Sequence, residues 1–335
     1  MSISNPFSSN NKTIEKASGF NPPPEKNSHT YKIAILLCTY QGERFLKEQL
    51  ASFEHQTHTN WELWASDDGS DDGTNAILKE FKNRFPDNKV SMIKGPSDGF
   101  LSNFLSLVCN KKIDTDYYAY ADQDDIWKAD KIERALNYLI KIPNALPSLY
   151  CSRTELINSS GQHIGFSPLF KKSPRFENAL TQNVGGGNTM VFNNVTRSLL
   201  MSAGEQVSVV AHDWWTYQLV SGAGGHVYYD QYPSLLYRQH NKNIIGTSHS
   251  WIARIKRIRM LFQGRFRAWN DRNTTELHNI KDMLTDDNQT TLEIFRQARQ
   301  SPLLKRLYLL HKCRIYRQTL LGNLGLIVAA LLNKL

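Results

Sequence analysis

The sequence predicts an α/β protein in which a doubly wound sheet is followed by C-terminal helices. Between residues 32 and 127, short apolar runs alternate with segments of helical spacing, a pattern typical of strands that alternate with helices. Polar and acidic residues come directly after three of the apolar runs. Beyond about residue 250, Arg, Lys, Leu and Ile recur at helical spacing, which indicates an appended group of helices.

The predicted elements can be placed in order along the chain. The nearly unbroken apolar run at 32–39 is typical of a strand that is buried on both faces. We then expect helices at 43–53, 75–85 and 100–108, and strands at 61–66, 89–94 and 117–121. The pattern loosens afterwards, with strands expected at 149–157 and near 235–237, a glycine stretch at 185–187 and a helix near 214–220.

Composition limits the partners and the compartment. The 335 residues carry a formal net charge of +9, which favours acidic partners such as phosphates, anionic lipid or nucleic acid without choosing among them. The four cysteines, Cys38, Cys109, Cys151 and Cys313, are far apart, so neither a zinc site nor a disulfide scaffold is indicated. The first thirty residues have no apolar core of a signal peptide, and we predict a disordered leader and a cytoplasmic protein.

Acidic residues at the predicted strand ends are the first candidate ligands. In open α/β sheets, ligands bind beyond the carboxyl ends of the strands. Asp122 and Asp124 flank one residue at such an end, where carboxylate oxygens suit Mg²⁺ or Mn²⁺ bound to a diphosphate. An isolated pair with this spacing is usually a solvated turn, but here it directly follows a buried strand. We therefore predict a divalent cation site.

A second acidic strand end suggests contacts with a nucleotide. Asp67 and Asp68 offer acceptors for a base N–H and for ribose hydroxyls, and Gly69 permits close backbone approach. The alternative is a turn followed by a helix cap, which we prefer for Asp72 and Thr74.

Six segments in a fixed order carry a resemblance to a known family. They are CTYQGERFLKEQLASFEHQTHTNWEL at 38–63, SDDGSDDGT at 66–74, YADQDDIW at 120–127, GGGNTMVFN at 185–193, HDWW at 212–215 and YRQHNKNIIG at 237–246. With these motifs the chain resembles family 2 glycosyltransferases, which have the GT-A fold. The third and sixth segments resemble particularly the branch that includes rhamnosyltransferases of bacterial surface polysaccharides.

The resemblance implies roles for residues at matching positions. Asp213 is implied as the catalytic base, with helix capping as the alternative, and Asp124 as a more direct metal ligand than Asp122. Arg238 and His240 are expected to contact the diphosphate, with His240 also a candidate third metal ligand, although a basic pair at a strand edge remains the alternative for both. The implied nucleotide-sugar-binding residues are Thr39, Tyr40, Glu43, Asp67, Asp68, Asp122, Gln123, Asn188 and Arg238.

One position departs from the family pattern. His212 stands where many relatives have Glu, and we expect it to shape the pocket rather than to catalyse. The resemblance divides residues 31–248 into a nucleotide-binding half, 31–127, and an acceptor half, 128–248, with basic helices at 249–335. The chain lacks the Q-x-x-R-W element of processive members, so addition of a single sugar is expected.

The predicted reaction is inverting, metal-dependent transfer of a sugar from a nucleotide-diphosphate donor, dTDP-rhamnose or a UDP-hexose. The acceptor would be a lipid-linked sugar or glycan in O-antigen or capsule synthesis. A sugar-phosphate nucleotidyltransferase is the nearest alternative, but the segment 38–45 lacks the Gly-rich basic loop that a triphosphate requires. A non-catalytic nucleotide-sugar-binding or nucleic-acid-binding protein is the third interpretation. Nucleic acid is disfavoured because the basic residues concentrate in the C-terminal segments.

The C-terminal segments suggest a membrane surface as a further partner. If residues 251–267 are helical, Ile252, Ile255 and Ile258 lie on one side and basic residues on the other. Residues 303–335 show the same combination of apolar and basic residues. This pattern is typical of helices that lie on anionic lipid, and it predicts peripheral contact with the inner face of the plasma membrane. The alternative is ordinary packing of these helices against the catalytic domain.

Overall fold

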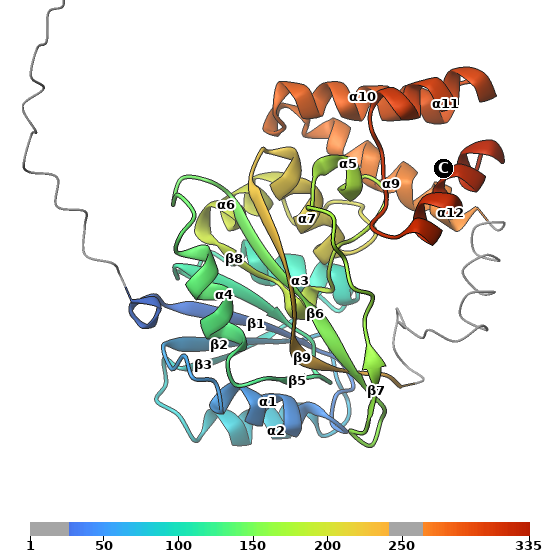
Figure 1. Ribbon diagram of the computed structural model, residues 1–335. Coiled ribbons are helices and arrows are strands. Elements are labelled where there is room, and N and C mark those ends of the chain that lie inside the picture. Colours follow the sequence, from blue (N-terminus) through green and yellow to red (C-terminus); the bar gives the residue numbers. More distant parts are fainter. Residues whose placement is uncertain (1–26, 241–263) are drawn as a thin grey trace, which may run out of the picture.

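A mixed sheet forms the centre of the molecule. The computed structural model describes residues 27–240 and 264–335, so most of the predicted leader lies outside the described residues. The strand order is β3-β2-β1-β4-β8-β6-β9-β5, with β7 paired to β6. Figure 1 shows helices covering the sheet and the C-terminal helices gathered at one end of the molecule. The predicted α/β fold with a helical C-terminal part is confirmed.

The first half of the chain alternates strands and helices, as the sequence predicts. After the short helix η1 (Ser28–Thr30), the elements are β1 (Ile33–Thr39), α1 (Leu46–Glu54), β2 (Trp61–Asp67), α2 (Thr74–Lys82), β3 (Val90–Lys94), α3 (Phe100–Cys109) and β4 (Tyr117–Ala121). Strands β1 to β4 pair in parallel. Their carboxyl ends therefore meet at one edge of the sheet.

Strand β1 shows why this half folds around a two-sided sheet. All seven of its residues are buried, and alternate side chains point to opposite faces. Ala34 and Leu36 join a cluster with residues of α3 and α7, whereas Ile33 and Ile35 join another with residues of α1, α2 and α4. The continuous apolar run is thus explained by helices on both faces.

The second half contains more sheet than the sequence predicts. Its elements are β5 (Ile126–Trp127), α4 (Lys131–Leu139), β6 (Ser148–Ile157), β7 (His163–Phe166), α5 (Phe176–Ala179), η2 (Gly187–Thr189), β8 (Val191–Asn193), α6 (Asn194–Ala203), α7 (His212–Gly222) and β9 (His226–Arg238). The strand expected near 235–237 is only the end of β9, which pairs in parallel with β6. Strand β8 lies antiparallel between β4 and β6.

The C-terminal helices share a core with the sheet. They are α9 (Arg265–Asn279), η3 (Lys281–Met283), α10 (Asp286–Gln300), α11 (Leu303–Lys312) and α12 (Leu320–Leu331). Leu277, Leu292 and Phe295 are fully buried in the cluster that also holds Trp215 of α7. These residues lie between the two segments, 251–267 and 303–335, for which packing or membrane contact is predicted, so α9 and α10 pack against the catalytic domain without deciding between those alternatives.

Most of the helix predicted at 251–267, and the boundary predicted at 248, lie outside the described residues. Across 27–240 and 264–335, no helix combines the length and the apolar character needed to cross a membrane.

Candidate active site

The carboxyl ends of β1, β2 and β4 bring the predicted site residues to one edge. Thr39 at the end of β1 lies in register with Asp67 at the end of β2, and Leu37 of β1 lies in register with Ala121 of β4. The acidic segment that starts at Asp122 therefore emerges beside the loop that follows β1. Parallel pairing of β1, β2 and β4 thus places motifs that are far apart in sequence next to one another at this edge.

Asp67 is held by several hydrogen bonds within the protein. Its carboxylate accepts from the Thr39 hydroxyl at 2.9 Å, the Ser70 amide at 2.9 Å and the Asn75 side chain at 2.9 Å. Burial acts to raise the pKa of Asp67, but these donors and the Ser70 hydroxyl outweigh it, so the pKa lies below its ordinary value. The carboxylate is therefore kept ionised at the strand end.

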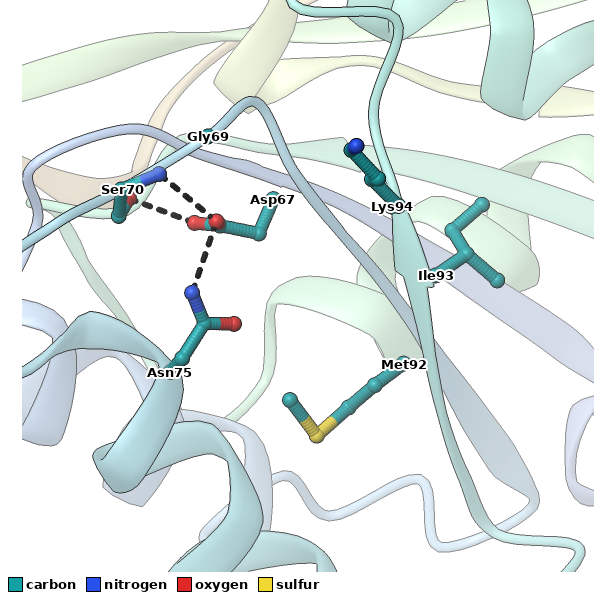
Figure 2. Close-up of a pocket in the computed structure, with 7 residues that line it drawn as sticks. All are labelled: Asp67, Gly69, Ser70, Asn75, Met92, Ile93 and Lys94. Atoms are coloured by element: carbon teal, nitrogen blue, oxygen red, sulfur yellow. Dashed lines mark hydrogen bonds between the residues drawn. The ribbon is translucent and has the colours of Figure 1, made fainter.

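A pocket of about 300 Å³ lies beside Asp67. Figure 2 shows Asp67 bonded to Ser70 and Asn75 on one side of it, with residues of β3 on the other. Its lining is Asp67, Gly69, Ser70, Asn75, Met92, Ile93 and Lys94. The pocket thus combines an anionic group, a lysine and apolar surface.

Asp68 organises the loop that leads into α3. Its two carboxylate oxygens accept from the backbone amides of Ser97 at 2.7 Å and Gly99 at 2.8 Å, and the residue is only 8% exposed. All of these hydrogen bonds of Asp67 and Asp68 come from donors within the protein. Their contact with a nucleotide stays a prediction.

The loop after β1 is tied to both neighbouring strand ends. Glu43 accepts from the Gly73 amide at 3.1 Å and donates its own amide to Asp72 at 3.1 Å. Gln123 pairs with the backbone of Tyr40 through two hydrogen bonds of 2.8 and 2.9 Å, while the Tyr40 side chain is 57% exposed. Tyr40 thus presents an aromatic ring at the site, and Gln123 positions its backbone.

Three carboxylates act on one another at this edge. Loss of hydration, followed by the charges of Asp124 and Asp213, raises the pKa of Asp122 to about 8. Such mutual repulsion shows that the three groups occupy one region of negative potential. Carboxylate oxygens grouped in this way suit a hard divalent cation.

The three predicted metal ligands are not gathered into one coordination set. In 27–240 and 264–335, no three His, Cys, Asp or Glu side chains form a group that could hold a metal ion. His240 Nε2 lies 2.6 Å from a carboxylate oxygen of Asp124, so this pair occupies an oxygen that a cation would use. Metal binding by Asp122, Asp124 and His240 stays a prediction.

Arg238 is buried and bonds the acidic loop to α1. It is 1% exposed, and its guanidinium donates to the Asp124 carbonyl at 3.0 Å and to Glu48 at 2.8 Å. The guanidinium also lies 4.5 Å from the centre of the Phe45 ring. These contacts fix the backbone of the acidic loop against α1. The predicted contact of Arg238 with a diphosphate is untested.

Asp125 is a site residue whose role the sequence did not indicate. It is fully buried and accepts from the Asn188 side chain at 2.5 Å and from the Arg238 amide at 3.2 Å. Lys131, also fully buried, lies with its ammonium 3.7 Å from the centre of the Trp127 ring. Burial lowers the pKa of Lys131 to about 7, and the charge of Asp125 opposes this shift.

Asn188, predicted to contact the sugar, is buried and bonded to Asp125. Its side chain has a role in holding the acidic loop, and its contact with a sugar remains a prediction.

Asp213 faces the 3-10 helix η2 from the first turn of α7. The helix begins at His212 and its N-cap is Ala211, so Asp213 is not the cap that the alternative interpretation requires. One of its carboxylate oxygens accepts from the Gly187 amide at 3.1 Å and the other from the Trp214 amide at 2.6 Å. Reduced hydration nevertheless raises the pKa of Asp213 to about 6, against the effect of these bonds.

His212, next to Asp213, is a buried and uncharged side chain. Its ring stacks on Phe104 with 3.8 Å between centroids, and burial lowers its pKa to about 3. A Cβ added at Gly187 would come within 2.4 Å of His212 Nε2. The imidazole therefore leaves room only for a glycine at position 187. The backbone amide of this glycine is the one that donates a hydrogen bond to Asp213. The expectation that His212 shapes a substrate pocket stays a prediction.

Comparison with known proteins gives a consistent result. The family model described as Glycosyl transferase family 2 matches residues 34–200. A dTDP-rhamnosyl transferase, RfbG of Shigella flexneri, is 26% identical over 266 residues, covering 75% of this chain and 86% of the relative. The glucosyltransferase WfgD of Escherichia coli is 28% identical over 135 residues, which cover 39% of this chain and 48% of WfgD.

A solved structure supports the fold. S. aureus TarS 1–349 in complex with UDP-GlcNAc superposes with a TM-score of 0.52 at 12% identity, covering 90% of this chain and 89% of that one. The family match spans the strand ends that carry Thr39, Asp67 and Asp124. The chain therefore has the GT-A fold and is a glycosyltransferase that belongs to family 2.

Proposed function

We propose that this glycosyltransferase adds one sugar to an acceptor hydroxyl, with inversion at the anomeric carbon and Asp213 as the base. The observation that carries the proposal is the environment of Asp213. Its carboxylate is anchored by the Gly187 amide, and its charge acts on Asp122 at the strand edge. A base with a pKa of about 6 is ionised near neutral pH and still accepts a proton.

The proposed step is a direct displacement. The acceptor oxygen forms a bond to the anomeric carbon while its proton passes to Asp213, and the bond from that carbon to the diphosphate oxygen breaks. The bonding electrons leave with the nucleoside diphosphate. A single base on the face opposite the leaving group gives inversion, because no covalent intermediate is formed.

A divalent cation is the proposed cofactor. Asp122 and Asp124 would hold it through carboxylate oxygens, with His240 beside Asp124 as the third candidate ligand. When bound, the ion would offset negative charge on the departing diphosphate. The position of Asp122 and Asp124 directly after the carboxyl end of β4 supports this assignment, since ligands bind at this edge of such sheets and carboxylate oxygens suit a hard divalent cation.

The relatives suggest the donor and the acceptor. RfbG is named as a dTDP-rhamnosyl transferase, and we propose dTDP-rhamnose first, with a UDP-hexose second. WfgD is named for a diphosphoundecaprenol-linked acceptor, so we propose a lipid-diphosphate sugar as the acceptor class. The exposed Tyr40 ring and the pocket beside Asp67 are the proposed surfaces for base and ribose. The place in the cell would be the cytoplasmic side of a bacterial membrane.

A donor panel tests the proposal. The purified chain is incubated with dTDP-rhamnose and UDP-hexoses, with a lipid-diphosphate sugar acceptor, in Mn²⁺, Mg²⁺ or EDTA, and nucleoside diphosphate release is measured. Release from one donor that needs the metal and the acceptor is expected. Failure of every donor to bind, with or without metal, would show that the strand-end carboxylates are not a nucleotide site.

The pH dependence gives an independent prediction. Because only the ionised form of Asp213 accepts a proton, kcat should rise with pH and level off above its pKa of about 6. The measurement is kcat at saturating donor and acceptor between about pH 5 and 8. Donor affinity measured over the same range serves as the control. A rate that is flat through pH 6, with unchanged affinity, would remove Asp213 as the base.

A further inference from the structure

The outward face of α12 is an apolar surface without a partner among the described residues. We define the α12 face as Leu320, Leu321, Leu324, Ile327, Val328 and Leu331, which are 40 to 84% exposed. Their spacing follows the helical repeat, so they form one stripe. Monomeric soluble proteins rarely expose a contiguous apolar stripe of this kind, and such surfaces mark interaction sites.

The opposite side of α12 holds the helix in place. Leu326, Ala329 and Ala330 are buried in a small cluster with Phe266 and Leu307 packed against it. Arg306 donates to the Ala330 carbonyl at 2.7 Å, which ties α11 to α12. The exposure of the α12 face therefore belongs to a helix that is anchored along its other side.

The segment before α12 is also fixed to the catalytic domain. The Asn178 side chain donates to the Tyr316 carbonyl at 3.1 Å, and the Gln318 side chain donates to the Lys172 carbonyl at 3.0 Å. Residues 316–318 are thereby bonded to the region around α5. In Figure 1, α11 and α12 lie with the other C-terminal helices, at the end of the molecule remote from β7.

The charged side chains of the segment that contains α12 have one sign. From residue 303 to 335 the chain contains Lys305, Arg306, Lys312, Arg314, Arg317 and Lys334 and neither Asp nor Glu. Lys305, Lys312 and Arg314 are exposed. Helix α12 itself carries no charged residue. An apolar stripe on a segment whose charged side chains are all basic is complementary to a surface with an apolar interior and negative head groups.

We propose that the α12 face docks this protein on an anionic phospholipid bilayer. The twelve residues of α12 span about 18 Å, less than the hydrocarbon thickness of about 30 Å, so the helix lies in the interface and does not cross it. Leu320 and Leu324 enter the boundary between head groups and acyl chains, and the exposed lysines contact anionic head groups. This inference is independent of the proposed reaction, although a shared surface would bring a lipid-linked acceptor close.

Vesicle co-sedimentation of the full chain tests the proposal. The vesicles are phosphatidylcholine alone or phosphatidylcholine mixed with phosphatidylglycerol. We expect binding to the mixed vesicles that weakens with added salt and falls about tenfold or more in a Leu324→Glu/Ile327→Glu variant. The matched control is Ile164→Glu/Phe166→Glu on β7, which adds the same two charges at residues that are 53% and 38% exposed and should leave binding unchanged.

Other outcomes would overturn the proposal. Absence of wild-type binding to the mixed vesicles, or equal binding by the α12 variant, would exclude the α12 face as the lipid contact. Light scattering of the wild type and of the α12 variant without lipid measures their oligomeric state, and thereby tests whether a second copy of the chain covers the α12 face instead. A dimer that the double substitution dissociates, together with no vesicle binding, would assign the face to a second copy of the chain. Circular dichroism of each variant confirms that it remains folded, and nucleotide release is not needed for any readout.

Discussion

Replacing Asp213 with Asn is expected to lower kcat by about 10² to 10⁴, because a positioned general base contributes an effect of this size. The substitution keeps the shape of the side chain but removes its ability to take the acceptor proton. Its amide oxygen can still accept from the Gly187 amide, so the local structure should persist. The measurement is initial-rate kinetics with the donor and acceptor found in the panel.

The control separates catalysis from folding and binding. Asp87→Asn makes the same chemical change at an exposed residue between α2 and β3, and it should leave kcat unchanged. Donor affinity of Asp213→Asn should match the wild type, and its melting temperature should fall by only a few degrees, because the Trp214 amide loses the oxygen that accepts its hydrogen bond. A variant that binds donor normally and retains more than about a tenth of the wild-type kcat would contradict the assigned role, since loss of a base costs at least that factor.

Removal of the Asp125 carboxyl group should cost about 2 to 5 kcal/mol of the free energy of unfolding, because each buried donor that is left without its acceptor costs about 1 to 3 kcal/mol. In Asp125→Ala, the Asn188 side chain and the Arg238 amide lose the acceptor that they share. Lys131 also loses the neighbouring carboxyl group whose charge opposes the lowering of its pKa. Urea denaturation at pH 7 measures the change.

A second substitution distinguishes the buried charge from the lost hydrogen bonds. Lys131→Met removes the ammonium while keeping an unbranched side chain against Trp127. The double variant Asp125→Ala/Lys131→Met should be less destabilised than the sum of the single variants by about 1 kcal/mol or more, which indicates coupling. Asp87→Ala, in the exposed turn, should change stability by less than about 0.5 kcal/mol. Additive single effects would show that Lys131 and Asp125 are independent.

The first half of the fold was predictable because its signals are local. The run at 32–39 and the helical spacings after it reflect burial on both faces of a parallel sheet, and β1 to β4 lie where these patterns indicate. Strands β5, β7 and β8 were not predicted, since they have only two to four residues. In β9 the prediction reached only its last residues, because burial along the strand is irregular and no simple alternation marks it.

The site was predictable in its location more than in its contacts. Strand-end carboxylates identified the edge where Asp67, Asp122 and Asp124 lie, because parallel strands share one carboxyl edge. The sequence did not show that Arg238 is buried against Glu48 or that Asp125 joins Asn188, since these bonds link residues 63 to 190 positions apart. Lys131, which opens an ordinary amphipathic helix, carries no local sign of burial.

The paired bonds between Gln123 and the Tyr40 backbone have a thermodynamic consequence. They connect the loop that presents the exposed Tyr40 ring to the loop that carries Asp122 and Asp124. A ligand that restricts one loop also restricts the other through these bonds. A second ligand, bound to the other loop, then pays a smaller cost in conformational entropy. If a nucleobase contacts Tyr40 and a cation binds Asp124, each should tighten the binding of the other by the same factor, because such coupling is reciprocal.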